Sequence, residues 1–600
     1  MSELALSAGT RQHWGGPDYL VPLMTPGQRG EYLVSMALAL AALAWAWSWW
    51  LQPEHFTDPW RYTANTIVLV WVTIVPFYYL LIVGRAKVPN RTIPVPQGLR
   101  VAMVVTKAPS EPFPVLRETL LAMLAQTYPH DTWLADEDPS PETLAWCAAN
   151  GVFVSTRRGV ADYHRATWPR RTRCKEGNLA YFYDHHGYER YDFVAQLDAD
   201  HVPDPDYLVE ILRPFADPRV GYVSAPSICD RNAATSWSAR SRLYAEGVLH
   251  GPQQAGHSLS MAPLCFGSHY AVRTEALRAI GGLGPELAED HSTTLMMNAH
   301  GWRGVHAIDA IAHGDGPATF ADLATQEFQW SRSMMTLLLA HTPAFLGGLP
   351  GHLRGRFLFS QLFYPLFSLM LPLAIVLPIL AIAFNVTMIN AGFVAFLVHF
   401  LPLALLVLAI PMRWRANGWL RPVDARFVSW ESNLFLVARW PWSLLGVLAA
   451  IRDRLTGTVA PFRVTPKGEA AEATLPLSVI APTLTVSLIC ALPLFAFPNA
   501  EIAAGFYVFT ALNAVLYGVA TIAIIVCHLR ENRGARLLAP LSSAACLRLG
   551  FFNALMVELP LLGIVLRAEQ GLCKVVEGSG SLIQPLAAGL VPLTSLSLSF

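Results

Sequence analysis

The chain has 600 residues, of which 53% are hydrophobic and only 14% are charged. So few charged residues exclude an ordinary soluble protein, and a formal net charge of zero gives no support for nucleic acid binding. The eight cysteines form no C-x-x-C pair, so the sequence indicates neither a zinc site nor a disulfide framework. The composition predicts a membrane protein with a soluble part.

Apolar windows long enough to cross a bilayer, which takes about 20 residues per helix, occur six times along the chain. They cover residues 32–51, 63–83, 357–384, 391–411, 476–497 and 503–527. Cytoplasmic flanks of membrane helices carry an excess of basic residues. If both ends of the six-span set are cytosolic, basic residues such as Arg85 and Lys87 lie on the cytosolic side, whereas the turns "FNVTMIN" and "PNAE", which carry no basic residue, lie outside. We therefore expect a multi-pass protein of the cell membrane, inner or plasma membrane, with its large soluble part in the cytosol.

The spans divide the chain into four regions. Residues 1–97 form an N-terminal region with two transmembrane helices, 98–350 a cytosolic domain, 351–527 a second membrane region, and 528–600 a tail to which the sequence assigns no fold. Residues 427–451 are apolar but contain Glu431, Arg439 and several tryptophans, which suits a helix lying in the membrane interface. Residues 549–566 are either a further span or a packed tail.

The cytosolic region alternates between strand and helix patterns. "GLRVAMVVT" reads as a buried strand, "PFPVLRETLLAMLAQ" as a helix and "TWLADED" as a strand that ends in acids. "PETLAWCAAN" then predicts a helix, "VFVSTR" a strand, and "YDFVAQLDAD" a further buried strand. This series predicts an α/β domain with a mostly parallel sheet covered by helices.

Acidic residues follow two of these strands. Asp136, Glu137 and Asp138 end one, and Asp198 and Asp200 end another. The carboxyl ends of strands are where open α/β sheets bind ligands, and crowded carboxylates there most naturally hold a hard cation. A third acidic pair, Glu289 and Asp290 in "AED", stands at the expected start of a helix, where an N-terminal capping role would also explain it.

The order of these motifs resembles the processive family 2 glycosyltransferases, the group that includes cellulose, chitin and hyaluronan synthases. The matching stretches are "ADED", "KEGN" at 175–178, "DAD" at 198–200, "FGS" at 266–268, "AED" at 288–290, "QEFQW" at 326–330 and "FRVTPKG" at 462–468. The resemblance implies a cytosolic GT-A type domain inserted between transmembrane helices. It also implies an inverting transferase that polymerises a β-linked polysaccharide from a UDP-sugar, most naturally UDP-glucose, and moves it across the membrane.

The resemblance also assigns roles to individual residues. Asp198 and Asp200 would hold Mg²⁺ or Mn²⁺ with the diphosphate of the donor, Asp136 or Asp138 would contact uridine, and Asp290 would be the catalytic base. The remaining predicted contacts with donor or acceptor are Lys175, Ser268, Glu289, Gln326, Trp330 and a gating loop with Phe462, Val464, Thr465 and Lys467. The expected partners are the UDP-sugar, the growing glycan, the lipid bilayer and export or accessory subunits.

Two departures from the family pattern stand out. Gln329 replaces the arginine of the family's Q-x-x-R-W motif, with Arg332 nearby as a substitute cation, and Ala288 replaces a threonine.

A non-processive transferase with a lipid-linked acceptor is the alternative; it would need neither the tryptophan of "QEFQW" nor the gating motif. A transporter is a second class, but the sequence contains no G-x-x-x-x-G-K-[ST] phosphate-binding loop.

Overall fold

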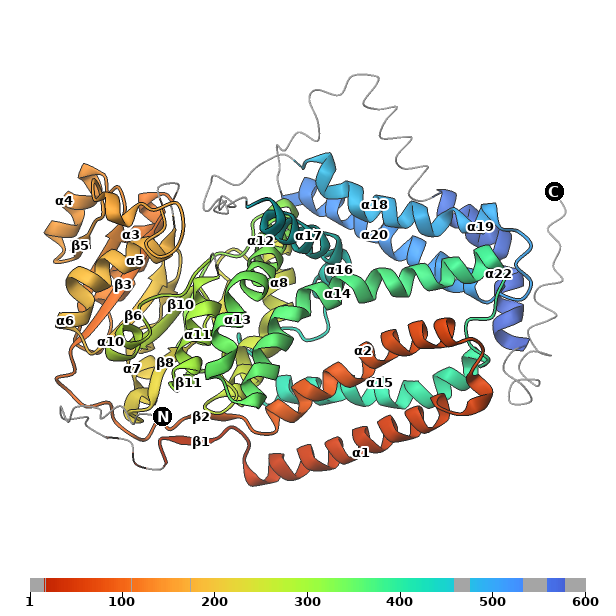
Figure 1. Cartoon of the computed structure of the whole chain (residues 1–600), viewed down its shortest axis with the longest axis horizontal. Helices are drawn as coiled ribbons and strands as arrows, with labels where there is room; N and C mark the ends of the chain where they lie inside the picture. Colours follow the sequence, from red (N-terminus) through yellow and green to blue (C-terminus); the bar gives the residue numbers. More distant parts are fainter. Residues whose placement is uncertain are drawn as a thin grey trace, which may run out of the picture. The chain divides into compact units, whose positions relative to one another are not determined.

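The computed structural model describes residues 14, 16, 18–108, 111–172, 174–286, 288–457, 475–531 and 558–577. They form two compact units (Figure 1). The first draws on Met1–Gly27, Leu81–Leu366 and Trp414–Glu472, and the second on Gln28–Leu80, Phe367–Arg413 and Ala473–Phe600. The predicted cytosolic region therefore shares its unit with a segment that lies after the fourth expected span.

A seven-stranded sheet forms the centre of the first unit, in the order β11-β8-β10-β6-β3-β4-β5. Neighbouring strands are parallel except for β10, which is antiparallel to both β6 and β8. The strands are β3 (Val101–Lys107), β4 (Asp131–Asp136), β5 (Phe153–Ser155), β6 (Phe193–Asp198), β8 (Val220–Ser224), β10 (His269–Arg273) and β11 (Arg303–His306). The predicted mostly parallel sheet covered by helices is thus confirmed.

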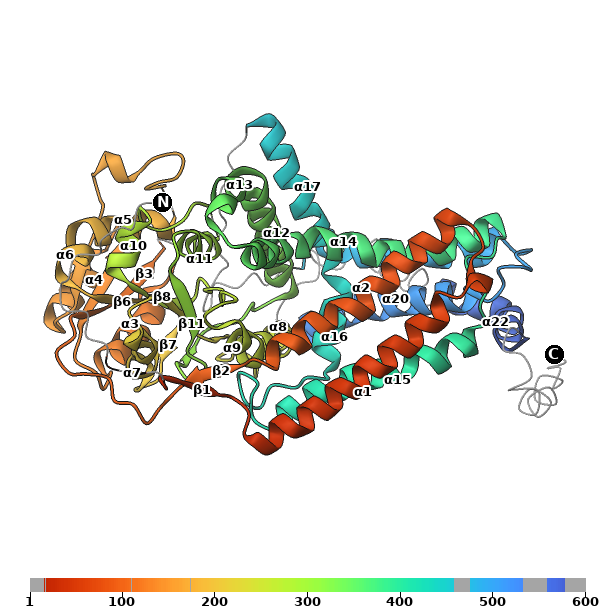
Figure 2. The ribbon, with the colours of Figure 1, turned by 60° about the horizontal axis from the view of Figure 1, so that its bottom comes forward.

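Both faces of this sheet are buried, because side chains along a strand alternate between its faces. In β3, Val101, Met103 and Val105 pack into one hydrophobic core, and Ala102 and Val104 pack into the other. The first core includes residues of α3 (Phe113–Leu124), α4 (Pro141–Ala149) and α7 (Tyr207–Leu212); the second includes residues of α5 (Lys175–Phe182), α10 (Thr274–Ala279) and α11 (Glu289–Ala299). Figure 2 shows these helices around the sheet.

Short elements complete the first unit. β1 (Leu20–Pro22) and β2 (Lys87–Pro89) form an antiparallel pair, and β7 (Val202–Pro203), β12 (Ala312–His313) and β9 (Ser227–Ile228) form a small third sheet. The further helices include α6 (Tyr188–Arg190), α8 (Trp237–Val248), α9 (Gln254–His257), α12 (Phe320–Thr336) and α13 (Thr342–Phe345).

The segment expected to lie in the membrane interface forms two helices, α16 (Trp430–Ala438) and α17 (Trp440–Thr456). Pro441, in the first turn of α17, cannot supply the N–H that would continue the preceding helix, so α16 ends before it. Within the first unit α16 packs against α8, and α17 packs along α12.

Seven helices of the described chain are long and apolar enough to cross a membrane. Six match the predicted windows: α1 (Pro26–Trp50), α2 (Pro59–Val83), α14 (Gly351–Phe384), α15 (Phe393–Ala416), the pair α18 (Leu477–Ala491) and α19 (Pro493–Ala496), and α20 (Phe506–Glu531). The seventh, Trp430–Thr456, covers α16 and α17. In the predicted tail, α22 (Leu559–Glu577) is a further helix.

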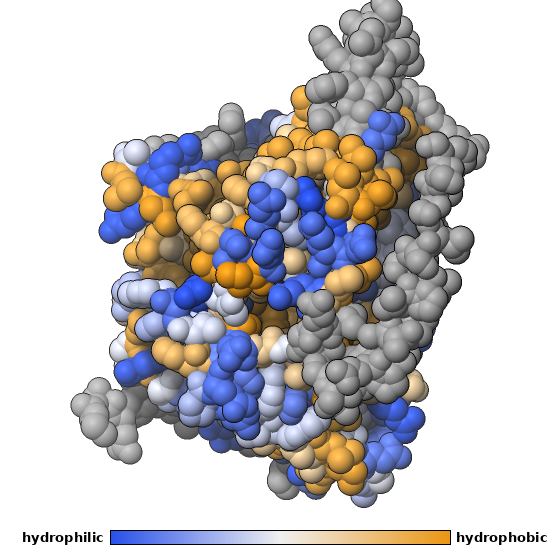
Figure 3. Space-filling model, turned by 90° about the vertical axis from the view of Figure 1, so that its right-hand side faces the viewer, coloured by the Kyte–Doolittle hydropathy of each residue, from blue (hydrophilic) through white to orange (hydrophobic). Residues whose placement is uncertain are grey.

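Large apolar side chains on these helices are exposed, among them Leu33 and Leu38 of α1 and Val72 of α2. Exposed apolar surface of this extent is unfavourable in water and suits contact with lipid. On the face drawn in Figure 3, hydrophobic side chains prevail above the centre, and hydrophilic ones occupy the centre and much of the part below it. The helices agree with a multi-pass membrane protein.

Candidate active site

Two aspartates and a histidine meet where β6 ends. Asp198, Asp200 and His201 each offer one ligand atom, and these atoms all lie within 4.8 Å of one another. Two carboxylates with an imidazole form a donor set that Mn²⁺ accepts readily and that also suits other divalent ions. The residues present therefore fit the predicted divalent ion. The sequence had predicted only the two aspartates, although His201 directly follows them in "DADH".

His201 is tied to this cluster electrostatically. Its Nδ1 lies 3.2 Å from Oδ1 of the buried Asp200. Burial lowers the pKa of His201, but the charge of Asp200 outweighs burial and raises that pKa to about 10. The imidazole would have to release its proton before it could bind an ion, so ion binding at this site should favour higher pH.

Lys175 approaches the same aspartates from the first turn of α5. Its Nζ donates to Oδ1 of Asp198 at 2.7 Å and to the carbonyl of Gly267. Burial lowers the pKa of Lys175, but its acidic neighbours, Asp198 first, raise it above its ordinary value. The lysine therefore stays charged and places a positive group among the carboxylates.

The rest of "KEGN" explains why the chain turns here. Glu176 accepts the backbone N–H groups of Arg170 and Arg171, both at 2.9 Å, and so holds the preceding loop. A Cβ at Gly177 would lie 2.2 Å from the backbone carbonyl oxygen of Arg171 and 1.9 Å from Nη1 of the buried Arg157, so only glycine fits at this position.

The first acidic cluster is divided between interior and surface. Asp136, at the end of β4, is 1% exposed and its Oδ2 lies 3.4 Å from Nζ of Lys107. Asp138 has a side chain that is 68% exposed and pairs with Arg158. Glu137 pairs with the buried Arg157. Of the two alternatives for the uridine contact, Asp136 is thus the residue at the sheet edge.

Glu289 and Asp290 begin α11, as the sequence predicted. Burial raises the pKa of both carboxyls above their ordinary values, and the charge of Lys175 opposes that rise. Asp290 accepts its hydrogen bonds from the backbone N–H groups of His291, at 2.7 Å, and Gly267. A carboxylate whose pKa is raised in this way is suited to accept a proton near neutral pH.

The "FGS" stretch joins these groups. The carbonyl of Ser268 accepts the backbone N–H of Asp198 at 2.8 Å. A Cβ on Gly267 would lie 3.4 Å from Oδ2 of Asp290, so a side chain there would contact the carboxylate. The hydroxyl of Ser268 is buried without a partner in the described structure. Gly267 and Ser268 thus bring the cluster at the end of β6 and the start of α11 to one place.

The predicted acceptor residues lie on α12. Gln326 and Trp330 both contact Arg242 of α8: Nη1 of Arg242 lies 3.5 Å from Oε1 of Gln326, and its guanidinium carbon lies 4.7 Å from the centre of the Trp330 ring. Arg242 also donates to Glu246 at 3.1 Å. Burial raises the pKa of Glu246, but Arg242 outweighs it and lowers that pKa to about 2. Sequence reasoning did not identify Arg242, since "RSRLYAEG" carries no recognisable motif.

Arg332 points to a different partner from the one that its sequence position suggested. Its Nε donates to Oδ2 of Asp453 at 2.7 Å, a bond that ties α12 to α17. Arg332 therefore has a structural partner within its own unit, and its position is explained without contact to the donor. The predicted gating residues Phe462, Val464, Thr465 and Lys467 lie outside the described residues.

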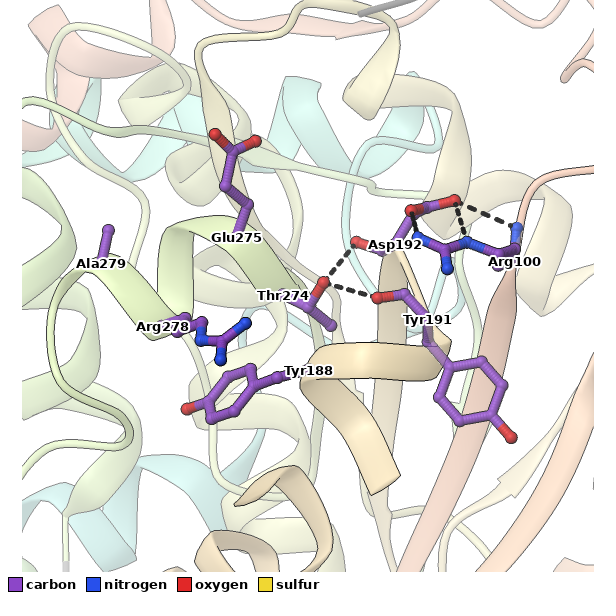
Figure 4. Close-up of a pocket in the computed structure, with 8 residues that line it drawn as sticks. All are labelled: Arg100, Tyr188, Tyr191, Asp192, Thr274, Glu275, Arg278 and Ala279. Carbon is purple, nitrogen blue, oxygen red and sulfur yellow. Dashed lines mark hydrogen bonds and ion pairs between the residues drawn. The ribbon is translucent and has the colours of Figure 1, made fainter. Parts of the chain in front are cut away.

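A pocket of about 370 Å³ lies elsewhere on the first unit, lined in part by Arg100, Asp192, Thr274 and Arg278 (Figure 4). Arg100 and Asp192 directly precede β3 and β6, and they form an ion pair at 2.6 Å. The pocket is therefore at the amino ends of these strands, away from the edge where parallel sheets bind substrates. None of the predicted site residues lines it.

Comparison with known proteins agrees with the motif order. The model of the family described as "Glycosyl transferase family group 2" matches residues 193–412. "Cellulose synthase 2" of Novacetimonas hansenii is 26% identical over 314 residues, which are 50% of this chain and 19% of that protein. The "Cellulose synthase catalytic subunit [UDP-forming]" of Komagataeibacter sucrofermentans is 26% identical over 253 residues, which are 40% of this chain and 31% of that protein.

Further similarities are shorter or structural. A "Probable glucomannan 4-beta-mannosyltransferase 1" of Arabidopsis thaliana is 31% identical over 144 residues, 23% of this chain and 26% of that protein. A mannosyltransferase from Pyrobaculum calidifontis, solved with GDP-Man and Mn²⁺, is 15% identical with a TM-score of 0.41, over 70% of this chain and 99% of that one. The matches to the cellulose synthases span a fifth to a third of those relatives. Residues 193–412 thus match the model of glycosyltransferase family 2, and the chain is similar to cellulose synthases over 40 to 50% of its length.

Proposed function

We propose that the protein is an inverting glycosyltransferase that polymerises a β-linked polysaccharide from a UDP-sugar, most naturally UDP-glucose, and passes the product across the membrane. The observation that carries this proposal is the meeting of three elements at one sheet edge. Asp198 and Asp200 at the end of β6, Lys175 of α5 and Asp290 of α11 are held together around Gly267.

This arrangement supplies the groups that sugar transfer requires. Asp198, Asp200 and His201 would hold the divalent ion, Mg²⁺ or Mn²⁺, which neutralises the charge that develops on the diphosphate. Lys175 adds a fixed positive charge beside Asp198. Asp290 would accept the proton of the acceptor hydroxyl, which is a poor nucleophile until it is deprotonated. Direct attack on an α-linked donor by that hydroxyl gives a β-linked product.

The acceptor side rests on α12. An aromatic face of Trp330 can stack against the apolar face of a pyranose, and the guanidinium of Arg242 lies over the ring and restrains it. The candidate spans would then provide the route for the product, because a polar glycan cannot cross hydrocarbon without polar contacts from protein. Asp136 would contact the uridine from the end of β4.

Product analysis tests this function. Membranes that contain the protein would be incubated with a panel of labelled UDP-sugars, and the product digested with linkage-specific glycanases. The proposal expects one preferred UDP-sugar and a long product that a β-specific glycanase degrades. A single sugar added to an organic-soluble lipid would favour the non-processive alternative, and transfer from none of the donors would contradict both.

A further inference from the structure

Arg356 is a buried arginine that has no protein partner in the described structure. It lies in the second turn of α14 and is 7% exposed. Its Nε is fully shielded, and its side chain makes no hydrogen bond or ion pair with any described residue. The buried Arg157 pairs with Glu137, and the partly buried Arg332 of the same unit pairs with Asp453. Arg356 therefore differs from them in lacking an acidic partner.

An unpaired guanidinium in the interior is costly. Arginine stays charged at any physiological pH, so it cannot relieve burial by losing its proton. A buried charge without a partner loses its hydration and gains nothing in return. The planar fork of N–H donors is matched by the oxygens of a phosphate or carboxylate, which accept two parallel hydrogen bonds.

Arg356 acts electrostatically on three described side chains, two histidines and a tyrosine. Burial and the charge of Arg356 lower the pKa of His291 to about 3, and the same two causes lower the pKa of His257 well below its ordinary value. Tyr222 is a further electrostatic neighbour. No carboxylate is among the groups that shift these three side chains. None of these three side chains is therefore a counter-charge for Arg356.

A hydrogen-bond chain fixes the imidazole of His291 beside Arg356. The hydroxyl of Thr342 donates to Oε1 of Gln361 at 2.9 Å, so the amide nitrogen of Gln361 donates to Nε2 of His291 at 3.1 Å. Nε2 is then an acceptor, and the neutral ring carries its proton on Nδ1. His291 is 4% exposed, so its hydrogen-bond partners in the protein, and not solvent, decide which ring nitrogen carries the proton.

We propose that Arg356 binds a phosphate group, with His291 and His257 as its neutral neighbours. Phosphate fits better than carboxylate because Arg356 lies near the start of a helix that is apolar enough to cross a membrane, and the surface of a bilayer presents phosphate groups. The side chain of His291 is directed to Gln361 of α14, whereas its backbone N–H donates to Asp290 of the candidate active site. The phosphate would be either free in solution or part of a lipid headgroup.

Thermal unfolding of the purified full chain in detergent tests the site without using catalysis. Inorganic phosphate would be titrated against potassium chloride of equal ionic strength, and phosphatidylglycerol against a galactolipid that has no phosphate. We expect one phosphate-bearing probe to raise the Tm of the parent. Arg356→Gln should lower the affinity for that probe at least about tenfold, the equivalent of one charge-assisted hydrogen bond.

Arg354→Gln is the matched control, because Arg354 is an exposed arginine on the same helix whose Nε donates to the carbonyl of Leu349. It should respond like the parent. A response to inorganic phosphate identifies a free anion, and a response to phosphatidylglycerol alone identifies a headgroup. If Arg356→Gln does not fold, Arg356→Lys, which keeps the charge but loses the fork, should still bind more weakly. No response of the parent to either probe, or an equal response of the parent and the Arg356 variants, would overturn the proposal.

Discussion

Nζ of Lys175 lies 2.7 Å from Oδ1 of Asp198, so a helix start and a strand end that are 23 residues apart in sequence share one ion pair. The lysine side chain is 16% exposed and that of the aspartate 32%, which leaves the aspartate open to a ligand on its other side. The same lysine donates to the carbonyl of Gly267, whose Cα faces Asp290. Lys175 thus links the two parts of the site electrostatically: it pairs with the proposed metal ligand Asp198, and its charge lowers the pKa of the proposed base Asp290.

Loss of either predicted metal ligand should weaken ion binding. In Asp198→Asn and Asp200→Asn, affinity for Mn²⁺ should fall at least about 10-fold, because mutation of a residue that only hydrogen-bonds to a metal ligand already has an effect of about this size. Electron paramagnetic resonance of free Mn²⁺ measures this without turnover. Asp192→Asn, at the amino end of the strand and paired with Arg100, should bind like the parent. Unchanged affinity in both ligand variants would exclude a metal site here.

Asp290→Asn should separate binding from chemistry. The amide keeps the shape of the side chain but cannot accept the proton of an acceptor hydroxyl, so transfer should slow about 10²- to 10⁴-fold. Binding of UDP should stay within a factor of a few, because the metal ligands and Lys175 are untouched. Calorimetric titration with UDP and the initial rate of transfer are the two measurements. Transfer at the parent rate would leave Asp290 with only its role at the start of α11.

As pH falls, the rate of transfer should begin to decrease at a higher pH than it would if the base had the pKa of an ordinary aspartate. Burial raises the pKa of Asp290 above its usual value of about 4, and the base must be ionised to work, so the rate falls as pH falls through the raised pKa. Lys175 opposes this rise, so Lys175→Met should move the acid limb to higher pH. Lys175→Arg, which keeps the charge, should leave it in place. An acid limb near pH 4 in the parent would contradict the assignment.

Arg332→Ala should damage the packing of α12 on α17 more than donor binding. The partners are 15% and 9% exposed, and removal of one partner from such a pair leaves a poorly hydrated charge, at a cost of about 3 kcal/mol. We expect a lower Tm with little change in KM for the UDP-sugar. Exchange of the two residues, Arg332→Asp with Asp453→Arg, should recover part of the lost stability. A large rise in KM at unchanged Tm would instead place Arg332 at the diphosphate.

Gln329→Arg complements that variant. Glutamine offers a neutral amide where a guanidinium would bring a full charge and two parallel donors. If the donor diphosphate passes this position, the added arginine should lower KM for the UDP-sugar, and Gln329→Lys should do so less because it lacks the fork. Equal KM values in all three proteins would show that position 329 does not reach the nucleotide.

The sequence by itself determined the series of strands and helices and the places where acids follow strands. Alternation along β3 and the apolar length of the spans are local properties, so they are visible without any tertiary contact. The start of α11 at Glu289 and the end of β6 at Asp198 followed from the same kind of pattern.

Only the tertiary structure decided which of these residues have one another as neighbours. "ADED" did not reveal that Asp136 is buried and Asp138 is paired with Arg158 at the surface, because side-chain direction at a strand end depends on what packs above it. Arg242 reaches Trp330 from 88 residues away, and Arg332 reaches Asp453 across 121. Such partners are brought together by the packing of whole helices, and a local sequence pattern does not show which helices pack against each other.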